Sequence, residues 1–249
     1  MRGEERGKIG EVPIIRSIPR DVDGLLPTLI LYHGWSSSKE SQRFRAFILS
    51  SLGYQVISPD AIHHGERGTL DYYDPENAKK YFWSTILKNL EESKSIIDYA
   101  IENYDADPNR IGILGHSMGG FTAAGIFTHN PKIKALVVFN GSCNWKYSND
   151  IFKQAIGIDN SEDLEDIEES VNFKDPMTNM DLIIDRPILM LHGNKDSLVD
   201  IESQRIFYDK IRPLYSNSNM IELIEYNNLN HFVTTNMMEE AAHWFKKYL

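Results

Sequence analysis

The sequence lacks the features that mark secreted and membrane proteins. Its 249 residues include a single cysteine, Cys143, so no internal disulfide can form and a disulfide-stapled secreted module is excluded. No run approaches the roughly 20 apolar residues that a membrane-spanning helix needs. The charged residues 1–8 lack the apolar core of a secretory signal peptide. These absences predict a cytoplasmic protein.

Positive charge is also scarce. The chain has 36 Asp and Glu against 26 Lys and Arg, a formal net charge of −10, so neither nucleic acid nor an anionic membrane is expected as its main partner. Charged residues make up 25% and aromatic residues 11% of the chain, which excludes a largely disordered protein. The length suits one α/β domain, so we expect a single domain over residues 1–249.

The sequence is rich in short apolar runs that alternate with longer helical patterns. This alternation is typical of a mostly parallel sheet covered by helices, and it predicts an α/β fold. Strands are expected at 28–33, 54–58, 110–114, 133–139, 187–191 and 220–225. Helices are expected at 39–52, 75–104, 118–129, 200–211 and 235–248. Residues 13–19 are candidates for antiparallel edge strands.

The alternation breaks between residues 140 and 186. This gap is too long for an ordinary loop in a compact domain, and it contains the acidic run 159–169. We interpret it as a small cap or lid inserted over the carboxyl edge of the sheet, although a solvated helical surface remains the alternative. The apolar residues Ile151, Phe152, Ile156 and Ile158 favour a segment that folds over a site.

The most specific motif is Gly115-His116-Ser117-Met118-Gly119-Gly120, between a predicted strand and a predicted helix. A serine hydroxyl is a weak nucleophile that must be exposed beside a base. The G-x-S-x-G pattern provides the exposure, because its glycines allow a sharp strand-to-helix turn. The helix start also favours the negative charge that develops there. Ser117 is therefore the candidate nucleophile.

A base and an acid are expected after the nucleophile, in the chain order serine, acid, histidine. Asp196 follows the strand at 187–191, and His231 lies between the last predicted strand and the last predicted helix. Both positions are at the carboxyl ends of strands, where open α/β sheets build their sites. His231 would take the proton from Ser117, and Asp196 would fix the histidine tautomer. Asp200 competes for the role of the acid, but its position favours the start of the next helix.

Two backbone N–H donors are expected to hold the oxyanion of an acyl-transfer reaction. One is Met118, directly after the nucleophile. The other candidate is Trp35, which follows Gly34 in the loop after the first central strand. A simple glycine turn is the alternative interpretation of this loop.

With these motifs the chain resembles the α/β-hydrolase superfamily. Within it, the chain resembles small bacterial carboxylesterases related to dienelactone-hydrolase-like and prolyl-oligopeptidase-like enzymes. The resemblance extends from the His33-Gly34-Trp35 loop to His231, and it implies the α/β-hydrolase fold, a triad of Ser117, Asp196 and His231, and an insertion that matches residues 140–186. Dienelactone hydrolases proper use a cysteine nucleophile, whereas this chain has a serine.

The expected activity is that of a serine carboxylesterase that acts on a small-molecule ester without a cofactor or metal. The adjacent His63 and His64 are not expected to bind a metal, because neighbours in sequence rarely hold one ion together. A small peptidase or amidase with the same triad is the alternative enzyme, and a catalytically silent binding protein is the alternative of a different class. Five aromatic residues are candidates for a substrate pocket or for the core: Tyr72, Tyr73, Tyr81, Phe82 and Trp83.

Overall fold

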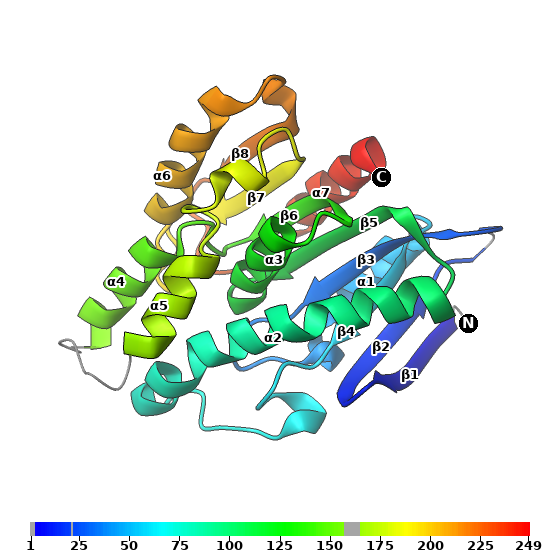
Figure 1. The fold of residues 1–249 in the computed structure, drawn as a ribbon, viewed down its shortest axis with the longest axis horizontal. Coiled ribbons are helices and arrows are strands. Elements are labelled where there is room, and N and C mark those ends of the chain that lie inside the picture. Colours follow the sequence, from blue (N-terminus) through cyan, green and yellow to red (C-terminus); the bar gives the residue numbers. More distant parts are fainter. Residues whose placement is uncertain (1–2, 21, 157–164) are drawn as a thin grey trace.

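The fold is an eight-stranded sheet with helices on both faces (Figure 1). The computed structural model describes residues 3–20, 22–156 and 165–249. The spatial order of the strands is β1-β2-β4-β3-β5-β6-β7-β8. Their bounds are β1 Gly3–Ile9, β2 Val12–Ile18, β3 Leu26–Tyr32, β4 Gln55–Pro59, β5 Ala106–His116, β6 Ile133–Phe139, β7 Ile188–Gly193 and β8 Ile221–Tyr226.

Six of the strands, β4-β3-β5-β6-β7-β8, pair in parallel, whereas β1 and β2 form an antiparallel hairpin that joins β4. The mostly parallel sheet predicted from the sequence is therefore confirmed. Leu29 and Ile30 of β3 point to opposite faces, and both are buried, as expected for a strand covered by helices on both sides. Because the strands run in parallel, their carboxyl ends meet at one edge of the sheet.

The antiparallel edge was predicted only in part. The candidate region 13–19 corresponds to β2, but β1 was not predicted as a strand. Six of its seven residues are exposed and polar or glycine, and only Ile9 is buried, so the strand has no apolar alternation that the sequence could reveal. Gly10, with φ of 57°, supplies the tight turn into β2.

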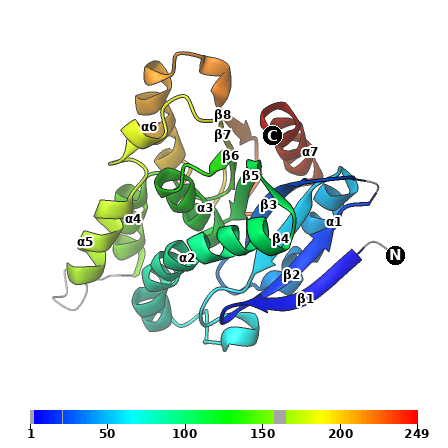
Figure 2. The same ribbon diagram turned by 45° about the vertical axis from the view of Figure 1, so that its right-hand side comes forward.

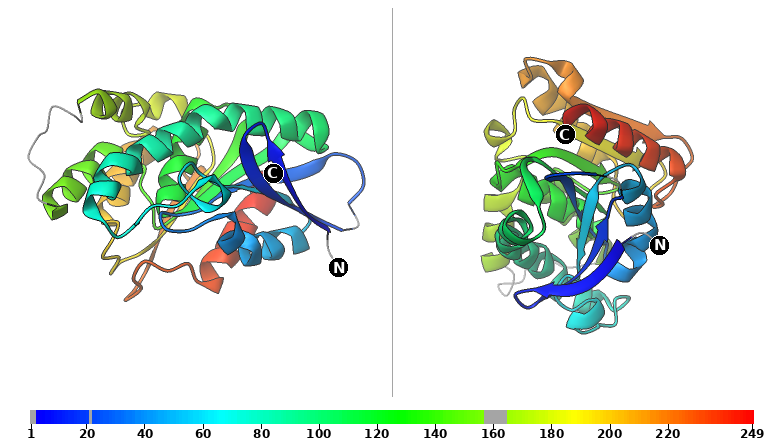
Figure 3. Two further views of the ribbon diagram at one scale, coloured as in Figure 1. Left: turned by 90° about the horizontal axis from the view of Figure 1, so that it is seen from below. Right: turned by 90° about the vertical axis from the view of Figure 1, so that its right-hand side faces the viewer.

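The helices form two layers. Helices α1 and α7 cover one face of the sheet, and α2, α3 and α6 cover the other, as Figures 2 and 3 show. In the left panel of Figure 3 the long α2 lies above the strands, with α1 and α7 below. The helix bounds are α1 Arg43–Ser51, α2 Pro75–Asn103, α3 Met118–His129, α4 Trp145–Ile156, α5 Glu165–Lys174, α6 Glu202–Ile211 and α7 Thr235–Tyr248. In the described ranges, no helix has both the length and the apolar character needed to cross a bilayer.

The segment between β6 and β7 carries α4 and α5, which contact each other, while α5 also contacts α2 and α4 also contacts α6. Trp145, at the start of α4, is fully buried, and its ring packs against Trp83 of α2 with centroids 5.4 Å apart. Residues 157–164, which include Ile158 and part of the acidic run, lie outside the described residues, as does the side chain of Ile156. The interpretation of this segment as a cap remains a prediction.

Candidate active site

Ser117 lies in the turn between β5 and α3, at the carboxyl edge of the sheet. Its backbone has φ of 56° and ψ of −126°, a conformation that residues other than glycine rarely adopt. Two backbone bonds hold the turn, since the Ser117 N–H donates to Phe139 O at 3.0 Å and the Gly120 N–H donates to Ser117 O at 2.7 Å. Strained serines of this kind concentrate at functional sites, where the surrounding structure fixes them.

The glycines that flank Ser117 are required by space. A Cβ at Gly115 would lie 2.0 Å from the carbonyl oxygen of Gly119, and a Cβ at Gly119 would lie 2.2 Å from the carbonyl oxygen of Tyr32. Both obstacles are backbone atoms that cannot rotate away. The motif therefore lets strand, turn and helix approach closely enough to present Ser117 at the sheet edge.

His231 and Asp196 form a hydrogen-bonded pair in neighbouring loops. Nδ1 of His231 lies 2.7 Å from Oδ2 of Asp196, whose side chain is completely buried. An N–H at Nδ1 donates to the carboxylate and leaves Nε2 free to accept a proton. Ser117, Asp196 and His231 line one cavity, although no hydrogen bond joins Ser117 to His231. In structures without a substrate such catalytic contacts are often long.

The carboxylate of Asp196 is held in its charged form. Burial alone would raise its pKa, but hydrogen bonds from His192, His231 and the Val199 N–H outweigh this effect and hold the pKa well below its ordinary range. Nε2 of His192 lies 3.3 Å from Oδ2 of Asp196 and 3.0 Å from Val199 O. His192 is completely buried against Asp196, a contact that only the tertiary structure reveals.

Asp200 has other partners. Its Oδ1 accepts the Glu202 N–H at 3.0 Å at the start of α6, and its Oδ2 accepts the hydroxyl of Tyr147 at 3.0 Å. It lines the same cavity but makes no hydrogen bond to His231. Of the two aspartates that the sequence left in competition, Asp196 bonds to His231 and Asp200 does not.

The loops that carry the acid and the base are joined to each other. The Lys195 N–H donates to Leu229 O at 2.9 Å, and the Ser197 N–H donates to Asn230 Oδ1 at 2.9 Å. A Cβ at Gly193 would lie 2.4 Å from Leu229 O, so the close approach of the loops depends on this glycine. The pairing of β7 with β8 continues into these contacts.

The two candidate oxyanion donors, the backbone N–H groups of Met118 and Trp35, have no acceptor among the described residues. The indole N–H of Trp35, in contrast, donates to Tyr72 O. Met118 is the first residue of α3, and Trp35 follows Gly34, where a Cβ would lie 3.3 Å from the Ser117 Cβ. The loop after β3 therefore passes directly beside the nucleophile. Two free N–H groups next to Ser117 form the kind of site that stabilises an oxyanion.

His33 holds the loop after β3 in place through two hydrogen bonds. Its Nδ1 lies 2.8 Å from Gly34 O, and its Nε2 accepts the Ala61 N–H at 3.0 Å. These partners require a neutral ring with the hydrogen on Nδ1. Complete burial lowers the pKa of His33 to about 4. The partner loop after β4 is itself anchored by a buried ion pair, with Lys39 Nζ 2.7 Å from Asp60 Oδ2.

A second neutral histidine packs on the base. The ring of His116 lies 4.6 Å from the ring of His231, between centroids. Burial, and then the neighbouring His231, lower the pKa of His116 to about 3. His116 therefore restricts His231 sterically without adding positive charge at neutral pH.

The cavity has a volume of about 730 Å³ and an aromatic wall. Tyr72, Tyr73, Phe82 and Trp83 line it, whereas Tyr81 packs against His63 outside it. Helix α4 adds Ile151 and Phe152, and the rings of Phe82 and Phe152 stack with centroids 5.9 Å apart. Helix α1 and the turn before it add Gln42 and Arg45, which the sequence analysis missed. Their spacing in the sequence could have indicated them, because residues 42, 45 and 49 lie on one face of a helix. Leu49 on that face is buried.

His63 and His64 each pack against a tyrosine ring, His63 on Tyr81 and His64 on Tyr72. The ring of His64 stacks on Tyr72 at 4.8 Å, and Nδ1 of His64 lies 2.8 Å from Ile62 O. Within residues 3–20, 22–156 and 165–249, no three His, Cys, Asp or Glu side chains gather to hold a metal ion.

The chain is similar to known proteins over most of its length. Residues 40–249 match the prolyl oligopeptidase family. The chain is 32% identical over 231 residues, 90% of both chains, to "Putative esterase YitV" of Bacillus subtilis (strain 168). It is 25% identical over 257 residues, 98% of both chains, to "Esterase YjfP" of Escherichia coli (strain K12). The fold is similar to the crystal structure of TT1662 from Thermus thermophilus, with a TM-score of 0.80, 18% identity, and coverage of 99% of this chain and 98% of that one.

Proposed function

The chain belongs to the prolyl oligopeptidase family, and we propose that it is a serine carboxylesterase that cleaves carboxylic esters through an acyl-enzyme intermediate. The observation that carries this proposal is the strained Ser117 in one cavity with the hydrogen-bonded pair of His231 and Asp196. The names of two relatives that match most of the chain, both described as esterases, support the ester as the substrate class.

In the proposed mechanism Ser117 Oγ attacks the ester carbonyl carbon while Nε2 of His231 takes the hydroxyl proton. The carbonyl oxygen becomes an oxyanion, which accepts hydrogen bonds from the N–H groups of Met118 and Trp35. The bond to the alcohol oxygen then breaks, and His231 returns the proton to that oxygen. Water deprotonated by His231 repeats the sequence on the acyl-enzyme and releases the carboxylic acid. Asp196 holds His231 in the required tautomer throughout.

The substrate would lie along the aromatic wall of the cavity. Phe82 and Phe152 stack there, so we propose that residues 140–186 act as a cap that contributes part of the pocket. An apolar wall of this kind suits an apolar acyl or alcohol group. A peptidase would use the same residues. This alternative is supported only by the name of the family, which refers to the cleavage of peptides.

The test combines a covalent probe with a substrate panel. A fluorophosphonate probe should label the wild-type protein and the Ser95→Ala control, an exposed serine on α2, but not Ser117→Ala. Ser117→Ala should lower kcat for 4-nitrophenyl esters by on the order of 10⁴–10⁶ with little loss of stability. Labelling of Ser117→Ala would contradict the assigned nucleophile. Faster cleavage of aminoacyl anilides than of every ester would favour the peptidase.

A further inference from the structure

One arginine in the cavity has no acidic partner. Arg45, on α1, lines the cavity together with Ser117 and His231. Its Nη1 donates to Oε1 of Gln42 at 2.7 Å, and among the described residues this is the only hydrogen bond of the guanidinium. No carboxylate of the described residues lies within ion-pair distance of its guanidinium.

Among the described arginines, Arg20 and Arg212 also lack an acidic partner, but both are exposed to water, whereas Arg45 is partly buried. Six others form ion pairs with Asp or Glu, namely Arg6, Arg16, Arg43, Arg67, Arg110 and Arg205. Arg186 is buried without an acid, but it donates to three backbone carbonyls and covers the ring of Phe127. Burial lowers the pKa of Arg45, because its charge is partly removed from water without such compensation. Uncompensated charge in a cleft is typical of a ligand-binding position.

Arg45 is also held in place. Gln42 is only 2% exposed, and its Nε2 donates to Ser37 Oγ at 3.3 Å and to Ser38 O at 3.4 Å. Those two bonds orient the amide so that its oxygen accepts from Arg45 Nη1. The Nε–Nη2 edge of the guanidinium is left without a partner among the described residues. This planar edge matches the two oxygens of a carboxylate, which it binds through two parallel hydrogen bonds.

The lining of the cavity therefore combines two chemistries. Residues 34–45 contribute hydroxyls, an amide and the guanidinium, whereas α2, α3 and α4 contribute aromatic side chains. We propose that Arg45 binds a carboxylate of the substrate, so that the preferred substrates are carboxylic esters with a free carboxylate on either the acyl or the alcohol part. This inference rests on the proposed esterase function, and it names the substrate class of that site.

The protein's formal net charge of −10 does not prevent Arg45 from binding a carboxylate that it contacts directly. Salt screens interactions between exposed charges beyond about 8 Å, whereas a half-buried guanidinium acts on a ligand within the cavity. Two carboxylates also line the cavity, and both have partners: Asp196 pairs with His231, and Asp200 accepts the hydroxyl of Tyr147.

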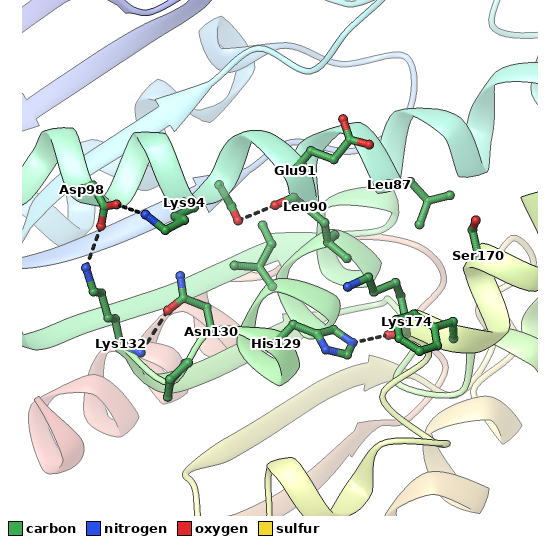
Figure 4. A pocket seen from close by; sticks show the side chains of 14 residues that line it. Leu87, Leu90, Glu91, Lys94, Asp98, His129, Asn130, Lys132, Ser170 and Lys174 are labelled. Carbon is green, nitrogen blue, oxygen red and sulfur yellow. Dashed lines mark hydrogen bonds and ion pairs between the residues drawn. The ribbon is translucent and has the colours of Figure 1, made fainter.

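A second cavity, of about 560 Å³, does not carry the same inference. Figure 4 shows that it lies between α2, α3 and α5. Its Lys94 and Lys132 share the carboxylate of Asp98, at 2.6 Å each, so both cations already have an acidic partner within the protein.

The test uses two matched pairs of esters. The first pair is 4-nitrophenyl glutarate monoester and its neutral glutaramate analogue, which places the carboxylate on the acyl part. The second pair is 3-acetoxybenzoate and 3-acetoxybenzamide, which places it on the alcohol part. In at least one pair the wild-type protein should prefer the anionic ester. The ratio of kcat/KM for the anionic to the neutral ester should fall roughly 10- to 100-fold in Arg45→Met, the size expected for a hydrogen-bonded charge.

The control is Arg43→Met, which removes the same charge from the same helix. Arg43 pairs with Glu4 at 2.8 Å and lies outside the cavity lining, so its replacement should leave the ratio unchanged. Arg45→Lys keeps the charge without the planar edge, and its ratio should lie between those of wild type and Arg45→Met. Ester hydrolysis with no preference for the anionic member of either pair, or an equal ratio in all variants, would overturn the inference. Failure of the esterase proposal is distinct, because then no member of either pair is hydrolysed.

Discussion

Acidification should destabilise the protein through His33. In the folded protein the ring of His33 is neutral, because its Nε2 accepts the Ala61 N–H. Protonation of Nε2 removes this acceptor. Burial lowers the pKa of His33 to about 4, against an unfolded value of about 6.5. Between these values the unfolded state binds more protons, so the stabilisation is fully present above about pH 6.5 and decreases as the pH falls toward 4. From pH 7 to pH 5 the expected loss is about 2 kcal/mol of unfolding free energy.

The experiment is guanidinium unfolding of the wild-type protein and His33→Asn at intervals from pH 7 to pH 5. Asn is chosen because its amide can still donate to Gly34 O, where Nδ1 of the histidine now lies. The variant should be less stable at pH 7, by roughly 1–3 kcal/mol, because the buried Ala61 N–H loses its acceptor. Its stability should nevertheless fall by about 2 kcal/mol less than that of wild type over the same pH range.

His116 is present in both proteins, so its contribution cancels in the comparison. His243→Asn, at an exposed position on α7, controls for the loss of a histidine as such. Parallel pH curves for wild type and His33→Asn, with unchanged m-values, would refute the assignment of a neutral, buried His33.

Three further predictions concern the active site. Asp196→Asn should lower kcat by roughly 10⁴ by stabilising the wrong histidine tautomer, while Asp200→Asn should have little effect; steady-state kinetics with a neutral ester would reveal a reversal of this order. Phe152→Ala should change kcat/KM for long-chain 4-nitrophenyl esters more than for the acetate, and an unchanged chain-length profile would argue against α4 as part of the pocket. Gly119→Ala should destabilise the fold by several kcal/mol in chemical unfolding, because its Cβ would lie 2.2 Å from Tyr32 O; near wild-type stability would show that the turn can relax.

The parts of the site that depend on local geometry were predictable. The glycines around Ser117 are needed within one strand-to-helix turn, so the sequence alone indicates the turn and the serine that it presents. The chain order of Asp196 and His231, each after a strand, was sufficient to predict the pair that the structure places 2.7 Å apart. Parallel strands bring the ends of distant segments to one edge, which makes order along the chain informative.

The parts that depend on packing between distant segments were not predictable. His192 contacts the acid, and His116 contacts the base, because of side-chain directions that no local pattern records. Arg45 was missed because an arginine on an amphipathic helix is ordinarily solvated, and only the tertiary structure reveals the absence of an acid around it. The strand β1 was missed because its exposed residues are held by pairing with β2 rather than by a buried face.

The bonds between the loop after β7 and the loop after β8 make the acid and the base a single mechanical unit. Lys195 and Ser197 are tied to Leu229 and Asn230, so displacement of one loop draws the other with it. This unit follows β7 and β8, the last two strands on one side of the sheet, whereas Ser117 follows β5 in the interior. Marginal strands open at a lower free energy than the centre of a sheet. We therefore expect heat to separate His231 from Ser117 before the rest of the molecule unfolds, so that activity is lost at a lower temperature than the far-UV circular dichroism signal.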